Sequence, residues 1–421
     1  MSLTLRIFVA LLAGLAVGVL LPADTGKHVL PFSDAVGNLW LQALQMTIIP
    51  LIAGLLFTGI AQAAGQAGGG RQAGRALLAF LALLIFSAAW SMIFVPLLLE
   101  WWPAPAAAAA SIITSSAEFA AGADVEASQA AIKLDLGKWL LGLVPANVFD
   151  ALAKGDMLPV VTFVAVFALA ATRLDDDRRR LLVGLFDAIK DAMLVLVGWI
   201  FVVAPLGVFA LAMGVGIKAG LGAFGLLGHY IVVLVAVQVG LIILVYPLAV
   251  VFGRVGPLAF ARAVLPAQAV AVSTQSSIAS LPAIFDGAER LGLPEATSRV
   301  VLPLAVSIFR ITSPCANIAV VLYVGHLYGM EHSALAFLGA LLAALVAAVS
   351  TGGLPGSITF LAACVPIANA MGVPIGVLPV LLAVELIPDV FRTLGNVTAD
   401  LAVTAIVGRR ERLDSSSSAA N

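Results

Sequence analysis

Residues 385–400 read ELIPDVFRTLGNVTAD, and they lie within an apolar run predicted to cross a membrane between residues 376 and 408. On a helix, the polar residues of this run recur every three or four positions and so share one face. We call them the polar stripe: Glu385, Asp389, Arg392, Asn396 and Asp400. Because charges at bilayer depth are costly, the polar stripe indicates a functional site. The alternative is an internal salt-bridge ladder that only holds helices together.

The composition of the whole chain requires lipid around most of its surface. Of 421 residues, 62% are hydrophobic and 11% are charged, and the mean hydropathy is +1.11. A water-soluble globule could not cover its surface with so little charge. The formal net charge of −1 argues against a nucleic-acid partner. Cys315 and Cys364 lie in apolar stretches and are interpreted as small buried side chains, not as a disulfide or a metal site.

Apolar runs of about 20 residues mark the candidate transmembrane helices. The eight predicted spans cover residues 5–22, 39–62, 76–102, 138–172, 181–213, 226–253, 296–328 and 376–408. The first is interpreted as a retained span and not as a cleaved signal peptide. The arginines of the short loops fall on one side of this arrangement, which predicts a multi-pass protein of the cell inner membrane with both termini cytoplasmic.

Two further apolar stretches, residues 257–291 and 334–371, are interrupted by small polar residues, Gly and Pro. The interruptions read STQSSIASLP at residues 273–282 and STGGLPGS at residues 350–357. Non-helical backbone at membrane depth is tolerated only in a protein interior or beside a wet cavity, so both are predicted to be tips of re-entrant helical hairpins at a site. Free N–H groups there can bind a carboxylate, and carbonyls can bind a cation. Each hairpin precedes a long span, as in an inverted repeat.

With these motifs, the chain resembles the dicarboxylate/amino acid:cation symporter family, the glutamate transporter family, over residues 6–412. Residues 389–401, DVFRTLGNVTADL, are similar to the final-helix motif of that family. The stretches SSIASLP at 276–282 and GLPG at 353–356 are similar to the tips of its two hairpins. Further similarity to its fourth and fifth spans is found in VPAN at 144–147, GDML at 155–158 and APLGVF at 204–209.

The resemblance implies an all-α polytopic membrane protein with eight transmembrane helices, two re-entrant hairpins and inverted repeats, which works as an elevator-type transporter. Residues 1–253 would form mainly the scaffold and the trimer contacts, with parts of the mobile domain. Residues 254–412 would form the transport core, and the polar residues 413–421 a disordered tail. The expected assembly is a homotrimer in the lipid bilayer, with the second hairpin as the extracellular gate.

The same resemblance implies roles for individual residues. Arg392 would hold the side-chain carboxylate of the substrate, Asp389 its ammonium group and Asn396 its main carboxylate. A planar arginine fork suits a carboxylate better than a lysine does. The other substrate-binding positions would be Ser276, Ser277, Gly353, Pro355, Gly356 and Thr393. No cofactor is expected, but sodium ions are possible coupling ions, bound at Asn396, Asp400, Ser307, Ser350 and Thr351.

One departure from the family pattern concerns the cations. Residues 309–313 read FRITS, where the family usually has Asn-Met-Asp-Gly-Thr, and Phe86-Ser87 aligns with the hydroxyl pair of another cation site. We hypothesise that Arg310 places a fixed positive charge near where a cation would otherwise sit, so that the carrier needs fewer sodium ions or uses protons instead. Glu385 could then carry a proton. Arg310 could instead pair with Glu385 or Asp389 without a transport role, or bind an extra substrate carboxylate.

The substrate stays open between two classes. If Asp389 is available for an ammonium group, aspartate or glutamate fits best; if Arg310 neutralises Asp389, an amine-free dicarboxylate such as succinate or malate fits as well. The functions considered are a coupled symporter, an anion-conducting channel and a carboxylate-binding membrane receptor. Two gate-like hairpins favour the symporter. Enzymatic catalysis is disfavoured because the sequence has no Ser–His or metal-ligand spacing near the polar stripe.

Overall fold

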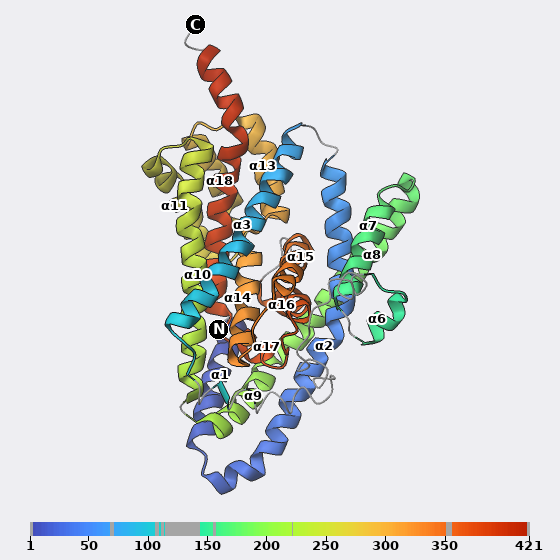
Figure 1. Cartoon of the computed structure of the whole chain (residues 1–421), viewed down its shortest axis with the longest axis vertical. Helices are drawn as coiled ribbons and strands as arrows, with labels where there is room; N and C mark the ends of the chain where they lie inside the picture. Colours follow the sequence, from blue (N-terminus) through green and yellow to red (C-terminus); the bar gives the residue numbers. More distant parts are fainter. Residues whose placement is uncertain are drawn as a thin grey trace.

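The computed structural model describes residues 3–67, 71–105, 109–110, 113, 144–154, 157–220, 222–350 and 356–418. All regular elements in these ranges are helices (Figure 1), which confirms the all-α prediction. The N-terminal helices are α1 (Leu3–Leu20), α2 (Ala23–Ala67), α3 (Arg71–Trp101), α6 (Val148–Lys154), α7 (Met157–Ala171), α8 (Asp176–Val202), α9 (Ala204–Ala219) and α10 (Gly222–Gly253). The C-terminal helices are α11 (Pro257–Thr274), α12 (Ser277–Arg290), α13 (Glu295–Ile308), α14 (Thr312–Leu327), α15 (Ala334–Ser350), α16 (Gly356–Met371), α17 (Leu378–Leu382) and α18 (Leu386–Ser418).

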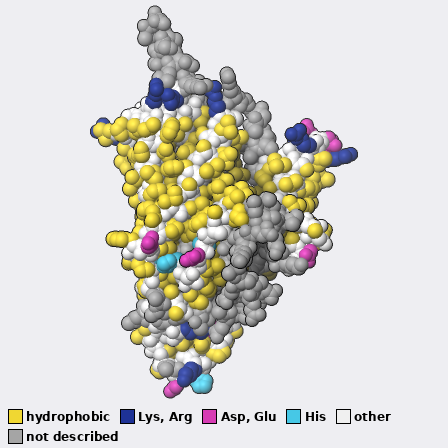
Figure 2. All heavy atoms as spheres, viewed as in Figure 1, with side chains coloured by type: hydrophobic (Ala, Val, Ile, Leu, Met, Phe, Trp, Pro, Cys, Tyr) yellow, Lys and Arg dark blue, Asp and Glu magenta, His cyan; other side chains and the backbone are white. Residues whose placement is uncertain are grey.

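The apolar surface and the long helices suit a multi-pass membrane protein. Among the described residues, 4 helices are long and apolar enough to cross a bilayer, or 5 if the bent pair α8–α9 is one span. Figure 2 shows hydrophobic side chains over the flank of these helices, with Lys and Arg gathered toward the ends. Such a band of apolar surface between charged ends is what a bilayer requires. The four helices are Gly74–Trp101, Phe224–Gly253, Glu295–Leu327 and Leu386–Arg409.

The predicted span over residues 181–213 is not one straight helix. α8 ends at Val202 and α9 begins at Ala204, with a bend of 58° between them. Pro205 lies in the first turn of α9, where its missing N–H is tolerated, but α8 could not continue through that position. Hydropathy alone could not reveal the bend, because the residues on both sides of it are apolar.

The N-terminal helices pack closely on one another. α1 contacts α9, and α2 contacts α7, α8 and α9. The indole Nε1 of Trp40 on α2 donates to the Ile200 carbonyl at 3.3 Å. Gly216 allows α9 to approach α1, because a Cβ at this position would lie only 2.6 Å from the Leu15 carbonyl oxygen. The missing side chain therefore sets the spacing between these two helices.

Two pairs of helices have the form of hairpins. α11 and α12 pack against each other and are joined at Gln275, which has the left-handed φ of 51°, and at Ser276. The Ser276 hydroxyl caps α12 by accepting a hydrogen bond from the Ala279 N–H at 3.2 Å. α15 and α16 also pack against each other, and the residues that join them, 351–355, lie outside the described ranges.

α18 lies at the centre of the C-terminal half, against α3, α10, α11, α12 and α13 (Figure 1). Beside it, α13 ends at Ile308 and α14 begins at Thr312, with Phe309 in an extended conformation. The non-helical residues 309–311 thus face the helix that carries most of the polar stripe. At its far end α18 continues to Ser418, into the segment that the sequence predicts to be a tail.

Replacing Gly216 by Val is expected to destabilise the protein by about 1–3 kcal/mol, because the new side chain would overlap the α1 backbone. The melting temperature of the purified protein in detergent measures the effect. Gly198→Val on α8 is the matched control, since a Cβ there would meet nothing within 4 Å. Equal melting temperatures for the two variants would contradict this account of the α1–α9 packing.

Candidate functional site

The polar stripe is buried at the core of the C-terminal half. Glu385 directly precedes α18, and the other four members project from it. The exposed fractions are 0% for Glu385, 5% for Asp389, 4% for Arg392, 1% for Asn396 and 0% for Asp400. The predicted common face therefore points into the protein and away from lipid, which is where costly charges can find partners.

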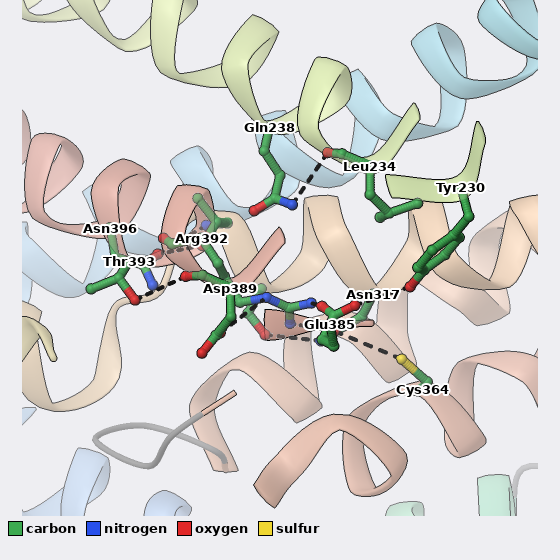
Figure 3. A network of polar contacts seen from close by, with 12 residues as sticks. Tyr230, Leu234, Gln238, Asn317, Cys364, Glu385, Asp389, Arg392, Thr393 and Asn396 are labelled. Atoms are coloured by element: carbon green, nitrogen blue, oxygen red, sulfur yellow. Dashed lines mark hydrogen bonds and ion pairs between the residues drawn. The ribbon is translucent and has the colours of Figure 1, made fainter. Parts of the chain in front are cut away.

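Arg392 is the centre of a buried ion-pair cluster, drawn in Figure 3. Its Nη2 forms an ion pair with Glu385 Oε1, and its Nε lies 3.7 Å from Asp389 Oδ1. Its Nη1 donates to the amide oxygen of Asn317 on α14 at 2.8 Å. One guanidinium thus faces two carboxylates and an amide, and each of its three nitrogens meets a different residue.

Glu385 is held from a second helix as well. The Tyr230 hydroxyl on α10 donates to Glu385 Oε2 at 3.0 Å, so both carboxylate oxygens have a donor. The cluster joins three elements, because Tyr230 comes from α10, Asn317 from α14 and Arg392 from α18. In this arrangement another carboxylate can replace that of Glu385 at Arg392, and the guanidinium is then still paired with an opposite charge.

Tyr230 and Asn317 were not predicted from the sequence. The polar stripe stands out by its charges and by their spacing on one helix, whereas these two residues are neutral and lie in other apolar runs. The available signal was a neutral polar side chain in a largely apolar helix: a buried hydroxyl or amide also needs a partner. Asn317 also accepts from the Cys364 thiol, with 3.8 Å between Sγ and Oδ1, so Cys364 is a small buried side chain beside the cluster.

Asn396 lies one turn beyond Arg392 and is bound to the start of α14. Its amide oxygen accepts from the Thr312 N–H at 3.1 Å and from the Thr312 hydroxyl at 2.8 Å. The same hydroxyl lies 2.9 Å from the Arg392 carbonyl oxygen. Thr312 therefore ties the break between α13 and α14 to two positions of the polar stripe.

The break itself is packed from α3. The Ser87 hydroxyl donates to the Ile311 carbonyl oxygen, and the Phe309 ring stacks on Phe80 with centroids 4.6 Å apart and an interplanar angle of 12°. Arg310, between them, is partly buried. Glu385 is paired with Arg392, so the described contacts do not support the hypothesis that Arg310 pairs with Glu385.

Some buried polar atoms of the site lack a hydrogen bond to any described residue. They include both carboxylate oxygens of Asp400, Asp389 Oδ1 and Asn396 Nδ2. A buried polar atom normally has a partner, so a group of them beside one helix indicates where a ligand, ion or proton can be received. Among the described residues, no group of three His, Cys, Asp or Glu side chains could hold a metal ion.

The other predicted site residues lie outside this cluster or outside the described ranges. Ser276 caps α12, Ser277 begins that helix, and Ser350 and Gly356 are the terminal residues of α15 and α16. The hydroxyl of Ser307 donates to Pro303 of its own helix at 2.6 Å, and that of Thr393 donates to the Asp389 carbonyl oxygen at 3.1 Å. The predicted positions outside the described residues are Thr351, Gly353 and Pro355.

Comparison with known proteins gives matches over nearly the whole chain. The family described as "Sodium:dicarboxylate symporter family" matches residues 3–410. A proton/sodium-glutamate symport protein of Bacillus subtilis (strain 168) is 26% identical over 413 residues, which cover 97% of this chain and 93% of that protein. A proton/glutamate-aspartate symporter of Escherichia coli (strain K12) is 26% identical, with coverages of 97% and 93%. A C4-dicarboxylate transport protein 2 of Ralstonia nicotianae is 27% identical, with coverages of 97% and 89%.

Replacing Thr312 by Val is expected to lower stability by about 1–3 kcal/mol, because it removes the one buried hydroxyl proton that lies between the Asn396 amide oxygen and the Arg392 carbonyl oxygen. Thermal unfolding of the purified protein measures the loss. Thr404→Val is the control: its hydroxyl bonds only the Asp400 carbonyl oxygen of its own helix, at 2.7 Å, among the interactions of the described residues. A loss for Thr312→Val no larger than for Thr404→Val would contradict a structural role of this link.

Proposed function

Because the chain belongs to the sodium:dicarboxylate symporter family, we propose that it is a secondary active symporter for small acidic substrates, either acidic amino acids or C4-dicarboxylates. The names of its relatives support both substrate classes and coupling to sodium or protons. The observation that carries the proposal is the buried Arg392, which already holds carboxylates of the protein itself. The same guanidinium can hold a carboxylate of a substrate.

Arg392 is proposed as the anchor for one substrate carboxylate. Its fork is fixed by Asn317 at 2.8 Å and by the two neighbouring acids, so its orientation is set before a substrate arrives. A preorganised donor pair binds more tightly than a mobile one because less conformational freedom is lost. The hairpin tips and Asn396 remain proposed partners for the rest of the substrate.

Glu385 is proposed as the group that yields its place to the substrate. In the structure it occupies Nη2 of Arg392, so a substrate carboxylate competes with it for the guanidinium. A buried Glu385 anion displaced from Arg392 would be strongly unfavourable, whereas the protonated carboxyl would not. Glu385 therefore takes up a proton when the substrate carboxylate replaces it at Arg392. This replacement couples proton binding to substrate binding.

The surroundings of Glu385 are compatible with that exchange. It faces the Tyr230 hydroxyl from α10, the Cys364 thiol from α16, and Asp389 and Arg392 from α18. Arg392 is the sole cation of this set and it stands opposite two acids. With both acids ionised the set has an excess negative charge before an acidic substrate arrives, so one bound proton makes entry of a further carboxylate less costly.

Transport is proposed to follow an elevator mechanism in a homotrimer of the inner membrane. Two groups of contacts support a division into two bodies: α9 contacts α1, α2 and α8, whereas α18 contacts α10, α11, α13 and α14. Between the two groups, α2 contacts α15 and α16. In this proposal residues 254–412 carry the substrate and residues 1–253 supply mainly the scaffold. Both termini are proposed to be cytoplasmic.

Uptake into vesicles by the purified protein tests the function. Labelled glutamate, aspartate, succinate and malate are offered under sodium, proton or potassium gradients imposed separately. Arg392→Ala is expected to weaken substrate binding by about 2–5 kcal/mol, because it also leaves buried acids unpaired. Arg262→Ala, at an exposed arginine on α11, is the control. Unchanged uptake by Arg392→Ala, or no uptake of any acid by the unaltered protein, would contradict the proposal.

The pH dependence of uptake tests Glu385. Since ionised Glu385 competes with the substrate for Arg392, uptake by the unaltered protein is expected to rise as the external pH falls. Glu385→Gln cannot ionise, so its uptake is expected to be independent of pH. Glu289→Gln, at an exposed acid on α12, is the control and keeps the pH dependence. A variant Glu385→Gln with the same pH profile as the unaltered protein would assign the proton to another group.

A further inference from the structure

A second buried titratable side chain, His229, lies near the start of α10 and is 4% exposed. Its Nε2 lies 3.1 Å from the carbonyl oxygen of Trp102, the residue that follows α3. Its Nδ1 lies 3.0 Å from the hydroxyl of Tyr323 on α14. Both ring nitrogens therefore have a partner, and the ring joins α10 to α14 and to the end of α3.

The partners of His229 determine the direction of both hydrogen bonds. A carbonyl oxygen can only accept, so Nε2 carries the hydrogen and donates to Trp102. In the neutral ring Nδ1 is then an acceptor, and it receives the hydroxyl of Tyr323. The carbonyl oxygen of Leu226, also on α10, lies 3.3 Å from the same hydroxyl and is a second acceptor for it. The hydroxyl end of Tyr323 is therefore held by α10.

The ring of Tyr323 packs against Tyr230, the residue that follows His229. The centroids of the two tyrosine rings are 5.2 Å apart and their planes meet at 69°, which is an edge-to-face contact. Both tyrosines are 0% exposed. The hydroxyl of Tyr230 donates to Glu385 Oε2 at 3.0 Å (Figure 3). A continuous series of contacts thus leads from His229 through Tyr323 and Tyr230 to Glu385.

The Tyr230 hydroxyl is one of the two donors that hold ionised Glu385, and the other is Arg392. A hydrogen bond to the charged form of an acid favours that form over the protonated one. Such a bond weakens steeply when donor and acceptor lose their alignment. The orientation of the Tyr230 ring therefore affects how readily Glu385 takes up a proton.

We propose that His229 is a positioning residue for proton uptake by Glu385: through Tyr323 it fixes the Tyr230 ring, with the hydroxyl aimed at the carboxylate. The inference rests on the proposed function, in which Glu385 exchanges a proton. Among the described contacts, His229 touches neither Glu385 nor Arg392, so it acts through the two tyrosines.

Tyr230 is the group through which His229 can reach Glu385. The other titratable groups that face Glu385 are Cys364 of α16 and Asp389 and Arg392 of α18. His229 itself contacts no carboxylate among the described residues. The titratable side chains of α14 at this end are Tyr323 and His326. The link to Glu385 is therefore made by hydrogen bonds and ring packing and not by a second ion pair.

The pH profile of vesicle uptake tests the positioning role. Tyr230→Phe removes the hydroxyl and should move the external pH of half-maximal uptake upward by about 1–2 units. His229→Ala should move it in the same direction, whereas His229→Gln can keep both hydrogen bonds and should restore the original profile. His28→Ala, at an exposed histidine on α2, is the control and keeps that profile. An unchanged profile for either His229→Ala or Tyr230→Phe would overturn the proposal.

Two further variants separate positioning from a general packing defect. Tyr323→Phe keeps the ring but removes the hydroxyl that His229 holds, so it should also shift the profile upward, and it replaces His229→Ala if that variant fails to fold. In the Glu385→Gln background, His229→Ala should cause no further change in uptake. An equal loss of uptake at every pH in both backgrounds would show a packing defect and overturn the positioning role.

Infrared titration of the purified full-length protein follows Glu385 without a substrate, and the Glu385→Gln variant identifies its carboxyl band. His229→Ala should raise the pH at which half of Glu385 is protonated, and His229→Gln should restore the original value. If this shift is seen but no acid is transported under any gradient, the proposed function fails while the positioning role stands. Normal uptake with no shift in the infrared titration would overturn the positioning role.

Discussion

The pairing of one buried guanidinium constrains the centre of this protein. Arg392 is 4% exposed in a helix that is apolar enough to cross a membrane, and an ion there is tolerated only with compensating partners. Glu385 and Asp389 supply the opposite charge, Asn317 accepts a hydrogen bond from the guanidinium, and the Tyr230 hydroxyl donates one to Glu385. These partners come from α10, α14 and α18. Pairing the one charge of Arg392 therefore constrains how the three helices are aligned along their axes.

Two kinds of feature could be predicted from the sequence: those that follow from helical periodicity and those that follow from the free-energy cost of burying charge in a membrane. The spacing of Asp389, Arg392 and Asn396 puts them on one helical face whatever surrounds them, and charge in an apolar run marks that face as interior. The break at residues 273–277 is likewise visible, because Ser276 is a good helix cap and the residues around it are polar. Both inferences depend only on neighbours in the chain.

Contacts between distant segments could not be predicted in the same way. Two such contacts join Ser87 to Ile311 and Tyr230 to Glu385. The members of each pair are far apart in the chain, and no pair of opposite charges and no regular spacing links them. The bend at Pro205 was missed for a different physical reason: hydropathy measures transfer to lipid and is insensitive to the direction of a helix. Neutral hydroxyls and amides in apolar helices also indicate contacts in the protein interior, and charged residues alone do not reveal them.

The position of Thr312 bears on how the two halves of the site communicate. Its hydroxyl contacts both the Arg392 carbonyl and the Asn396 amide, so the proposed substrate anchor and the predicted cation ligand share one hydrogen-bonding partner. In a carrier that binds a mobile cation, such a link would let the ion organise the substrate site. Here Thr312 follows Arg310 by two residues, in the same break between α13 and α14. The link between Arg392 and Asn396 is made by the chain itself, and proton uptake by Glu385 is the proposed step that responds to the membrane gradient.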